Sequence, residues 1–508
     1  MQRVLPPRHG LPLFDTAAIR GIETRTQASL EPGALMQRAG LAVARLALAL
    51  APHARRFAVL AGPGNNGGDG FEAALHLQRW GKQVEVTTLA DASKQPADAR
   101  AALQRARDAG VTIADAPNPA FVPEFALDAL LGIGTLRPPE GAMQAAIQRL
   151  NALACPVLAV DLPSGLHADT GAVFGTDAVV AQHTLSLLAL KPGLFTHSGR
   201  DHAGTVWTDS LGADASGTAP SAWLTGEDEV AALGPRRRHA QHKGSFGDVV
   251  IVGGARGMGG AAWLAARAAL AAGAGRVYVD MLGEPSDNPA ATHDPGRPEI
   301  MLRPGWARHA TPPQRAGHLV VCGCGGGDAV AAALAPLLSQ TRRLVLDADA
   351  LNAIAADSSL QALLAARPHR GHPTVLTPHP LEAARLLGCS TADVQADRVA
   401  AATRLAQTFG SVVVLKGSGT VVAEAGRVPA LNGTGNAALA SAGTGDVLAG
   451  WLGGRWSQDA GHDLPHAAFD AARAAVFLHG QAANHAPAAP LRAGDLIELM
   501  HRLSVWPP

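Results

Sequence analysis

The clearest evidence for the fold is the stretch Phe57-Ala-Val-Leu-Ala61, an apolar run, with the glycine-rich loop Gly62-Pro-Gly-Asn-Asn-Gly-Gly-Asp-Gly70 after it. Residues 71–80 then carry apolar side chains at helical spacing, and Val84-Glu-Val-Thr-Thr-Leu89 follows as a second strand. Two strands joined through a helix form a crossover unit, in which the strands are parallel. The stretch therefore predicts a parallel α/β sheet.

The same pattern recurs further along the first 210 residues. Residues 126–131 form a strand candidate before Gly132-Ile-Gly134, and Val157-Leu-Ala-Val160 leads into Asp161-Leu-Pro-Ser-Gly165. In each case polar residues follow a strand, where doubly wound sheets place their ligand sites. We expect a doubly wound domain over residues 1–212.

A second α/β series follows a small, polar, proline-bearing stretch at residues 213–225, which is the best linker candidate. Its apolar strand candidates are nearly continuous, as expected for strands covered on both faces. They are residues 248–252, 276–279, 318–321, 343–346, 374–376 and 411–415. Alanine-rich helical segments lie between several of them, so we expect a second, mostly parallel α/β domain over residues 226–508.

Composition excludes several classes of protein. Lys plus Arg and Asp plus Glu both number 42 in 508 residues, so no net charge attracts nucleic acid or an anionic membrane. No apolar run approaches the roughly 18 residues of a membrane span. Residues 1–15 lack the apolar core of a secretory signal, so we expect a cytoplasmic protein.

The cysteines and lysines are few. Four scattered cysteines suit neither a disulfide framework nor a zinc site, and Cys322-Gly-Cys324 lacks a second pair. The chain has only five lysines against many arginines, so each lysine is a candidate for a place that needs a compact ammonium. Three of the five, Lys191, Lys243 and Lys416, stand beside glycine-rich or strand-end motifs.

The first domain carries its chemistry at these strand ends. The run Asn65–Asp69 can cradle a phosphate or ribose hydroxyls at a helix start, and it lacks the lysine and serine of a Walker loop. Asp161 is the best-placed carboxylate for proton transfer, although a carboxylate that only caps the next turn is the alternative. Lys191 either tunes Asp161 or lies at the surface. Asn66, Asp128 and Ser164 offer oxygen donors that suit a hard cation.

Four motifs occur in an order that resembles the NAD(P)H-hydrate epimerase family. They are Leu35-Met-Gln-Arg-Ala-Gly40, residues 62–70, Asp128-Ala-Leu-Leu-Gly-Ile-Gly134 and Asp161-Leu-Pro-Ser-Gly165. The resemblance covers most of residues 10–210 and implies a Rossmann-like domain that interconverts the R and S forms of hydrated nicotinamide. It further implies a potassium ion at Asn66, Asp128 and Ser164, with Asp161 as catalytic residue. The implied substrate contacts are Asn65, Asn66, Gly67, Gly68, Asp69, Gly132, Ile133, Gly134, Thr135, Leu136, Arg137, Pro138 and Asp161.

The second domain contains the stretch Ala442-Gly-Thr-Gly-Asp446-Val-Leu-Ala-Gly450, which places a carboxylate directly after a glycine turn at a helix start. Amides of Gly443, Thr444 and Gly445 can form an anion hole there, and Asp446 can act as a base. This arrangement suits transfer of a phosphoryl group to a hydroxyl. A glycine turn with an aspartate cap is the alternative.

Further strand ends of the second domain point to the same chemistry. Asp347 and Asp349 suit either magnesium or the cap of the following helix. His379, between two prolines, is favoured as a substrate contact over a structural histidine. Lys416-Gly-Ser-Gly-Thr420 offers an ammonium and mobile amides to nucleotide phosphates.

These clusters resemble the ADP/ATP-dependent NAD(P)H-hydrate dehydratase family of the ribokinase-like fold, from about His239 to the C-terminal region. One departure is Cys322-Gly-Cys-Gly-Gly-Gly327, where the family usually has Gly-Pro-Gly-Leu-Gly. The resemblance implies magnesium and ADP as co-substrate, with a homo-oligomer as the expected assembly. It implies that Ala261, Gly327, His379 and Asp446 contact the hydrate, Asp446 being catalytic, and that Lys416, Gly417, Ser418, Gly419, Thr420 and Gly445 hold the nucleotide.

Together the two resemblances imply a bifunctional repair enzyme that epimerises NAD(P)H hydrate and dehydrates the S form to NAD(P)H, with ADP converted to AMP and phosphate. The alternative is a ribokinase-like small-molecule kinase. Under a third hypothesis the first domain is a non-catalytic nucleotide-binding or protein-interaction module. That hypothesis predicts that Asp161→Ala leaves epimer conversion unchanged.

Overall fold

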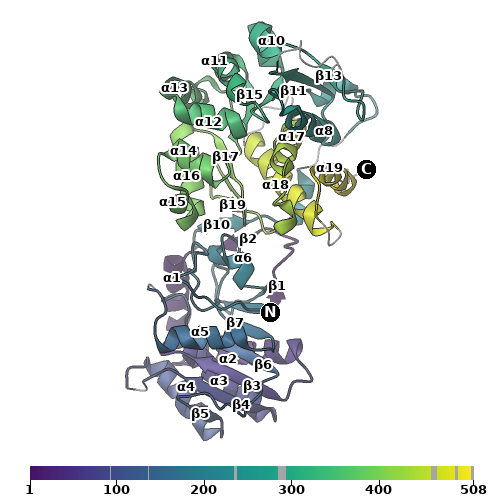
Figure 1. Ribbon diagram of the computed structural model, residues 1–508. Helices are drawn as coiled ribbons and strands as arrows, with labels where there is room; N and C mark the ends of the chain where they lie inside the picture. Colours follow the sequence, from purple (N-terminus) through teal and green to yellow (C-terminus); the bar gives the residue numbers. More distant parts are fainter. Residues whose placement is uncertain are drawn as a thin grey trace. The chain divides into compact units, whose positions relative to one another are not determined.

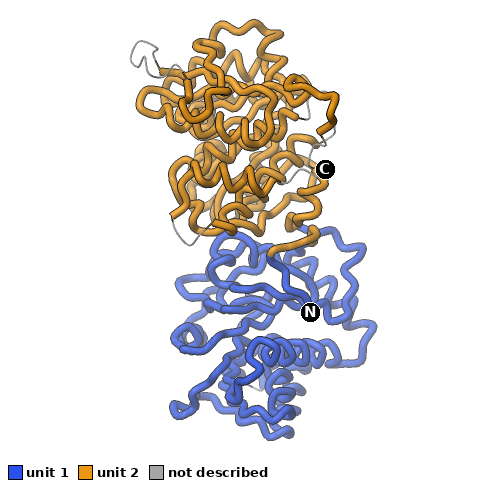
Figure 2. The backbone as a smooth tube through the Cα atoms, turned by 90° about the vertical axis from the view of Figure 1, so that its right-hand side faces the viewer, with its two compact units in different colours: residues 1–5, 12–222 blue, residues 6–11, 223–508 orange. Residues whose placement is uncertain are grey.

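The computed structural model describes residues 1–91, 93–135, 137–233, 237–283, 293–458, 466–486 and 490–504. The chain divides into two compact units, which Figure 2 draws in different colours. Unit 1 comprises Met1–Leu5 and Pro12–Ala222, and unit 2 comprises Pro6–Leu11 and Trp223–Pro508. The short strand β2 (Leu11–Leu13) lies where the chain passes from unit 2 back to unit 1.

The sheet of unit 1 has the order β1-β9-β8-β7-β6-β3-β4-β5, and all its pairings are parallel except that of β1 with β9. From β3 the chain builds outward through β4 and β5, and it then returns to place β6 on the other side of β3. A doubly wound sheet opens a crevice at such a switch point. The strands are β1 (Gln2–Arg3), β3 (Arg56–Ala61), β4 (Gln83–Thr88), β5 (Thr112–Ala114), β6 (Phe125–Ala129), β7 (Val157–Val160), β8 (His183–Leu187) and β9 (Thr205–Asp209).

Helices cover both faces of this sheet. Alternate strand residues enter different apolar clusters: Val59 packs with α2, α3 and α4, whereas Leu60 packs with α5. This alternation is the period of two that strand geometry imposes. The helices of unit 1 are α1 (Thr16–Ala28), α2 (Ala34–Leu50), α3 (Asn65–Arg79), α4 (Ala97–Asp108), α5 (Ala142–Ala152) and α6 (Gly199–His202).

Helix α3 begins at Asn65, whereas the sequence pattern predicted a loop as far as residue 70. At two glycines of this stretch, one before the helix and one in its first turn, neighbouring backbone leaves no room for a side chain. A Cβ on Gly62 would lie 1.8 Å from the carbonyl oxygen of Leu130, and one on Gly67 would lie 2.0 Å from the carbonyl oxygen of Gly62. These glycines bring the start of α3 against the end of β6.

The sheet of unit 2 runs in the order β13-β12-β11-β14-β15-β16-β17-β18-β19-β10. Pairings from β13 to β17 are parallel, and β18 is antiparallel to both neighbours. The chain leaves β11 for β12 on one side and returns to β14 on the other, which creates a second switch point. The strands are β10 (Ala222–Leu224), β11 (Asp248–Gly253), β12 (Arg276–Met281), β13 (Met301–Leu302), β14 (Leu319–Cys322), β15 (Arg343–Leu346), β16 (Thr374–Leu376), β17 (Val412–Leu415), β18 (Val421–Ala423) and β19 (Ala430–Leu431).

Two helical layers enclose this sheet (Figure 1). Helices α8, α17, α18 and α19 pack in one apolar cluster on one face, and α11 to α14 and α16 lie on the opposite side of the strands. The helices are α7 (Glu227–Ala232), α8 (Gly259–Ala271), α9 (Trp306–His309), α10 (Pro312–Gly317), α11 (Ala331–Gln340), α12 (Ala348–Ala356), α13 (Ser358–Ala365), α14 (Pro380–Leu387), α15 (Thr391–Ala396), α16 (Arg398–Phe409), α17 (Thr444–Ser457), α18 (Ala467–Asn484) and α19 (Ala493–Leu503).

Small residues bring α17 close to α8. A Cβ on Gly450 would lie 2.0 Å from the carbonyl oxygen of Ala265, and a Cβ on Gly454 would lie 2.2 Å from that of Ala269. On a further face, a Cβ on Gly453 would clash with Val321 of β14 at 2.5 Å. The glycines therefore seat α17 against both α8 and the sheet, and this packing places the N-terminus of α17 at the strand ends.

Both sheets confirm the predicted α/β class, with a doubly wound sheet in unit 1 and a covered, mostly parallel sheet in unit 2. Strand β10 lies within the stretch that the sequence marked as a linker candidate. Among the residues that the structure describes, no helix combines the length and the hydropathy needed to cross a bilayer.

Candidate functional site

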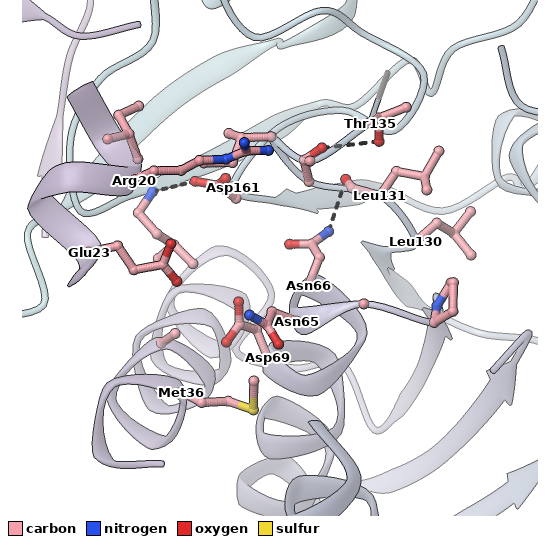
Figure 3. A pocket seen from close by; sticks show the side chains of 18 of the residues that line it. Arg20, Glu23, Met36, Asn65, Asn66, Asp69, Leu130, Leu131, Thr135 and Asp161 are labelled. Atoms are coloured by element: carbon pink, nitrogen blue, oxygen red, sulfur yellow. Dashed lines mark hydrogen bonds between the residues drawn. The ribbon is translucent and has the colours of Figure 1, made fainter. Parts of the chain in front are cut away.

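A cavity of about 860 Å³ opens in unit 1 at the switch point between β3 and β6 (Figure 3). Residues that follow β3, β6 and β7 line it, together with residues of α1 and α2. Most of the predicted substrate contacts of the first domain line this cavity: Asn65, Asn66, Asp69, Gly132, Ile133, Gly134, Thr135, Arg137, Pro138 and Asp161. Gly67 and Gly68 are buried in the adjoining first turns of α3. Leu136 lies outside the described residues.

Three of the carboxylates that line this cavity come from different elements and influence one another. Glu23 lies on α1, Asp69 lies on α3, and Asp161 follows β7 (Figure 3). Burial raises the pKa of Asp69 well above its usual range, and the charges of Asp161 and Glu23 raise it further. Burial also raises the pKa of Glu23, with a contribution from the charge of Asp161. The environment of the cavity thus favours the protonated form of Asp69 and of Glu23, and carboxyl groups of this kind can donate or accept a proton.

Asp161 is held by a buried lysine. The Lys191 ammonium donates a hydrogen bond to Oδ1 of Asp161, and it also donates to Oγ of Ser186 at 3.2 Å and to the carbonyl oxygen of Leu187 at 2.9 Å. The Lys191 side chain is fully buried, which excludes the surface position that the sequence left open. Asp161 has a φ of 68°, an uncommon conformation for a residue other than glycine. The backbone and the lysine together fix where its carboxylate points.

The three predicted cation ligands also converge in unit 1. Both oxygens of Asp128 accept hydrogen bonds from Ser164, one from Oγ at 2.6 Å and one from the backbone N–H at 2.8 Å. Oγ of Ser164 in turn accepts from the N–H of Leu131 at 2.8 Å, and Nδ2 of Asn66 donates to the carbonyl oxygen of Leu131 at 3.0 Å. Burial raises the pKa of Asp128 to about 6, and among the described residues no cationic side chain pairs with this carboxylate.

The second cluster of polar groups lies in unit 2 at the N-terminus of α17. Gly443, in the left-handed conformation, precedes the helix, and Asp446 lies in its first turn, as the sequence predicted. The first N–H groups of a helix lack partners within the helix and attract anions. Burial raises the pKa of Asp446 to about 6, and the nearby charge of Asp347 adds to this increase. Asp446 is therefore a base that can accept a proton near neutral pH.

An ion pair stands beside this helix start. Nζ of Lys416 lies 2.7 Å from Oδ1 of Asp347, which also accepts a hydrogen bond from Oγ1 of Thr377 at 2.7 Å. Burial opposes the charge of Lys416, but Asp347 and Glu382 outweigh it and raise the pKa of Lys416. A Cβ on Gly445 would lie 3.5 Å from Nζ of Lys416. The ammonium and the amides of α17 thus meet at one place.

Asp349 and the loop after β17 are fixed by other contacts. Oδ2 of Asp349 accepts a hydrogen bond from the N–H of Gly327 at 2.8 Å, which joins the first turn of α12 to the loop after β14. Buried Arg398 donates to the carbonyl oxygens of Leu415 and Lys416 at 3.2 Å and 3.0 Å. This guanidinium anchors the start of the predicted nucleotide loop, residues 416–420, whose first residues are exposed or half-buried.

His379 begins α14 as a helix cap. Its Nδ1 accepts hydrogen bonds from the N–H groups of Leu381 and Glu382, and its Nε2 lies 3.2 Å from Oε1 of Glu382. The imidazole nevertheless stays 47% exposed, so its role as a helix cap leaves part of the ring accessible. Burial raises the pKa of Glu382 to about 7. Ala261, the remaining predicted contact, lies in the first turn of α8 beside the loop of Gly325.

Sequence reasoning missed three groups at these sites. Glu23 lies on α1, a helix whose sequence carried no motif. Glu382 follows His379 by three residues in the sequence but received no role. Cys324 was set aside as a zinc ligand and noted as a departure in its loop, yet its thiol, Asp347 and Asp446 offer three ligand-type atoms that lie within 4.8 Å of one another.

Comparisons with known proteins match each of the two units to a protein family. Residues 32–193 match the family described as YjeF-related protein N-terminus, and residues 249–503 match the family described as NAD(P)H-hydrate dehydratase. The bifunctional NAD(P)H-hydrate repair enzyme of Escherichia coli strain K12 is 39% identical, over 89% of this chain and 84% of that protein. The enzyme of the same name from Leishmania braziliensis is 36% identical, over 93% and 89%.

A solved structure is similar to the second unit. The ADP/ATP-dependent NAD(P)H-hydrate dehydratase of Bacillus subtilis, co-crystallised with ATP and Mg²⁺, is 30% identical and covers 54% of this chain and 95% of its own, with a TM-score of 0.46. The relatives that span most of the chain do not favour a small-molecule kinase with an accessory domain. The chain belongs to the family of bifunctional NAD(P)H-hydrate repair enzymes.

Proposed function

We propose that unit 1 interconverts the R and S epimers of NAD(P)H hydrate and that unit 2 dehydrates the S epimer to NAD(P)H with ADP as phosphoryl donor. Family membership supports the pair of activities. The observation that carries the second activity is the position of Asp446 in the first turn of α17, where the Lys416 ammonium lies next to Gly445.

In unit 2, Asp446 takes the proton of the ring hydroxyl as the hydroxyl oxygen attacks the terminal phosphorus of ADP. The phosphoanhydride bond breaks and AMP leaves, while the amides of residues 443–445 and the Lys416 ammonium bind the transferring phosphoryl oxygens. The phosphate ester then loses phosphate from the ring carbon and a proton from its neighbour, which restores the ring double bond. Magnesium enters with the nucleotide as part of the co-substrate.

The remaining contacts of unit 2 extend this assignment. Ala261, Gly327 and His379 would bind the hydrate, and Gly417, Ser418, Gly419 and Thr420 would bind the nucleotide. Their places at the ends of β11, β14, β16 and β17 support the assignment, because these ends share one edge of the parallel sheet.

In unit 1, Asp161 would move the proton that epimerisation at the hydroxyl-bearing carbon requires. The residues Asn65 to Asp69 and Gly132 to Pro138, most of which line the cavity, would bind the nucleotide portion of the hydrate. Asn66, Asp128 and Ser164 would hold potassium. Their buried, oxygen-only donor set fits a hard cation, and the unpaired carboxylate of Asp128 supplies the charge that such an ion balances.

The test mixes purified protein with both epimers of NADH hydrate, potassium, magnesium and ADP, and follows the absorbance of reduced nicotinamide. Full recovery is expected in the wild type. Asp446→Ala should abolish recovery, and Asp161→Ala should stop it near the S fraction. A parallel assay with ATP distinguishes the phosphoryl donor. Absence of recovery with either nucleotide would contradict the proposal and would favour a kinase that releases a stable phosphorylated product.

A further inference from the structure

The thiol of Cys324 lies next to the proposed base of unit 2. Cys324 follows β14 and is fully buried, and its thiol lies beside the carboxylate of Asp446. Its Sγ, a carboxylate oxygen of Asp446 and one of Asp347 lie within 4.8 Å of one another. The three residues come from three separate segments of the chain, so the fold alone brings them together.

In a hydrogen bond between these two side chains, only the thiol can be the donor when Asp446 is ionised. Burial raises the pKa of the Cys324 thiol well above its usual range, and the charges of Asp347 and Asp446 raise it further. The sulfur therefore keeps its proton and points it at an acceptor. A hydrogen bond to an ionised carboxylate fixes the direction of that carboxylate and favours its charged form.

We propose that Cys324 is a positioning residue of the dehydratase site, whose thiol holds the Asp446 carboxylate in the orientation that receives the proton of the hydrate hydroxyl. The inference rests on the function proposed for unit 2. It concerns a residue in the loop where this chain departs from the family pattern. The thiol does not touch the reacting atoms, and it acts through Asp446.

The other charged groups around Asp446 have different roles. Asp347, at the end of β15, and Asp349, on α12, raise the pKa of Asp446, whereas Lys416 lowers it by charge. His479 of α18 contacts the same helix turn through Nε2, 3.0 Å from the carbonyl oxygen of Thr444. Since these groups remain when the thiol is removed, a substitution at Cys324 alone measures the effect of the thiol on Asp446.

The test compares Cys324→Ala, which lacks the donor, with Cys324→Ser, which keeps one. In Cys324→Ala the kcat of dehydration should fall about five- to tenfold, as expected for loss of one hydrogen bond to a charged group, while the KM for ADP stays unchanged. The acid limb of the pH–rate profile should move to higher pH, because the lost hydrogen bond favoured the ionised base. Cys324→Ser should restore the acid limb toward its wild-type position.

Cys322→Ala is the matched control. Cys322 is also fully buried and ends β14, but the carboxylate near it is Asp280. This variant should keep the wild-type pH profile. Thermal unfolding of each variant, compared with the wild type, reports whether unit 2 is folded. If Cys324→Ala does not fold, Cys324→Val, with a larger apolar side chain and no donor, takes its place.

The outcomes separate the two proposals. A wild type that restores no NADH at any pH contradicts the function proposed for unit 2. An active wild type whose acid limb is the same in Cys324→Ala, or is not restored in Cys324→Ser, overturns the role of Cys324 and leaves that function intact.

Discussion

The ammonium of Lys191 and the carboxylate of Asp161 form a buried ion pair on the wall of the cavity in unit 1. Lys191 also donates to Ser186 and to the backbone of Leu187, so its three protons have three acceptors. A fully satisfied ammonium of this kind fixes its partner. The pair therefore orients the one carboxylate to which we assign proton transfer.

Replacement of Lys191 by methionine should remove epimerisation and destabilise unit 1. The variant leaves the Asp161 carboxylate without its buried cation. The loss of one member of such a pair lowers the free energy of unfolding by about 3–5 kcal/mol. Epimer interconversion measured by chromatography and chemical unfolding of the protein test both effects.

Lys82→Met provides the control for this substitution. Lys82 belongs to the same unit, and its Nζ donates to the carbonyl oxygen of Ala54 at 2.6 Å, away from the residues that line the cavity. This variant should keep epimerisation. Equal activity in Lys191→Met and Lys82→Met would contradict the role of the Lys191–Asp161 pair.

Asp446→Asn should lower the rate of dehydration by about 10²- to 10⁴-fold, the usual contribution of a general base. The asparagine keeps the shape of the side chain but cannot take a proton. In the wild type the rate should fall as the pH drops through about 6, because Asp446 is then protonated. Epimerisation should stay unchanged in the variant, and an unaltered dehydration rate would exclude Asp446 as the base.

Gly62→Ala should destabilise unit 1 and disrupt its cavity, whereas Gly64→Ala should not. A Cβ on Gly62 would lie 1.8 Å from the carbonyl oxygen of Leu130, and no atom lies within 4 Å of a Cβ on Gly64. Overpacking of this kind lowers the free energy of unfolding by about 1–3 kcal/mol or more. Thermal unfolding and binding of a hydrate analogue distinguish the two variants, and equal stability would show that the loop relaxes without cost.

Potassium should stabilise unit 1 through Asp128. In the wild type, replacing tetramethylammonium in the buffer with potassium should raise the unfolding temperature and the rate of epimerisation. Asp128→Asn should remove both responses. Because burial raises the pKa of Asp128 to about 6, the response should weaken as the pH falls through about 6. Asp91→Asn, at an exposed carboxylate of the same unit, is the control. A potassium response retained in Asp128→Asn would place the ion elsewhere.

The sequence predicted those parallel strands that are continuous apolar runs, but it missed β5, β8, β9 and β13, which are short or contain polar residues. Residues 157–160, 343–346 and 374–376 were expected as strands and are β7, β15 and β16. The start of α3 was missed because glycines at Gly67 and Gly70 oppose a helix locally, and only close contact with Gly62 and Ala129 explains them. The antiparallel β18 and β19 are too short to produce a pattern.

The sites were predictable where a side chain stands directly after a strand, as Asp161, Asp347 and Lys416 do. Sequence could not predict which of these groups meet. The contact between Cys324 and Asp446 joins positions more than a hundred residues apart, and it depends on how α17 packs against α8 and β14. The burial of Lys191 likewise depends on tertiary structure, since its local sequence was equally consistent with the surface.

His479 should make unit 2 less stable in mild acid. Burial lowers the pKa of His479 to about 4 from its ordinary value of 6.5, so between these values the unfolded chain binds a proton that the folded chain does not. Stability therefore falls as the pH drops below the unfolded value, by about 2 kcal/mol at about pH 5. His479→Gln keeps a donor for the carbonyl oxygen of Thr444 but does not titrate, so its unfolding free energy should decrease less between about pH 7.5 and about pH 5. Asp446 and Glu382, whose raised pKa values act in the opposite direction, are present in both proteins and cancel in this comparison. Equal pH dependence of chemical unfolding in the two proteins would show that His479 becomes protonated without leaving the folded state.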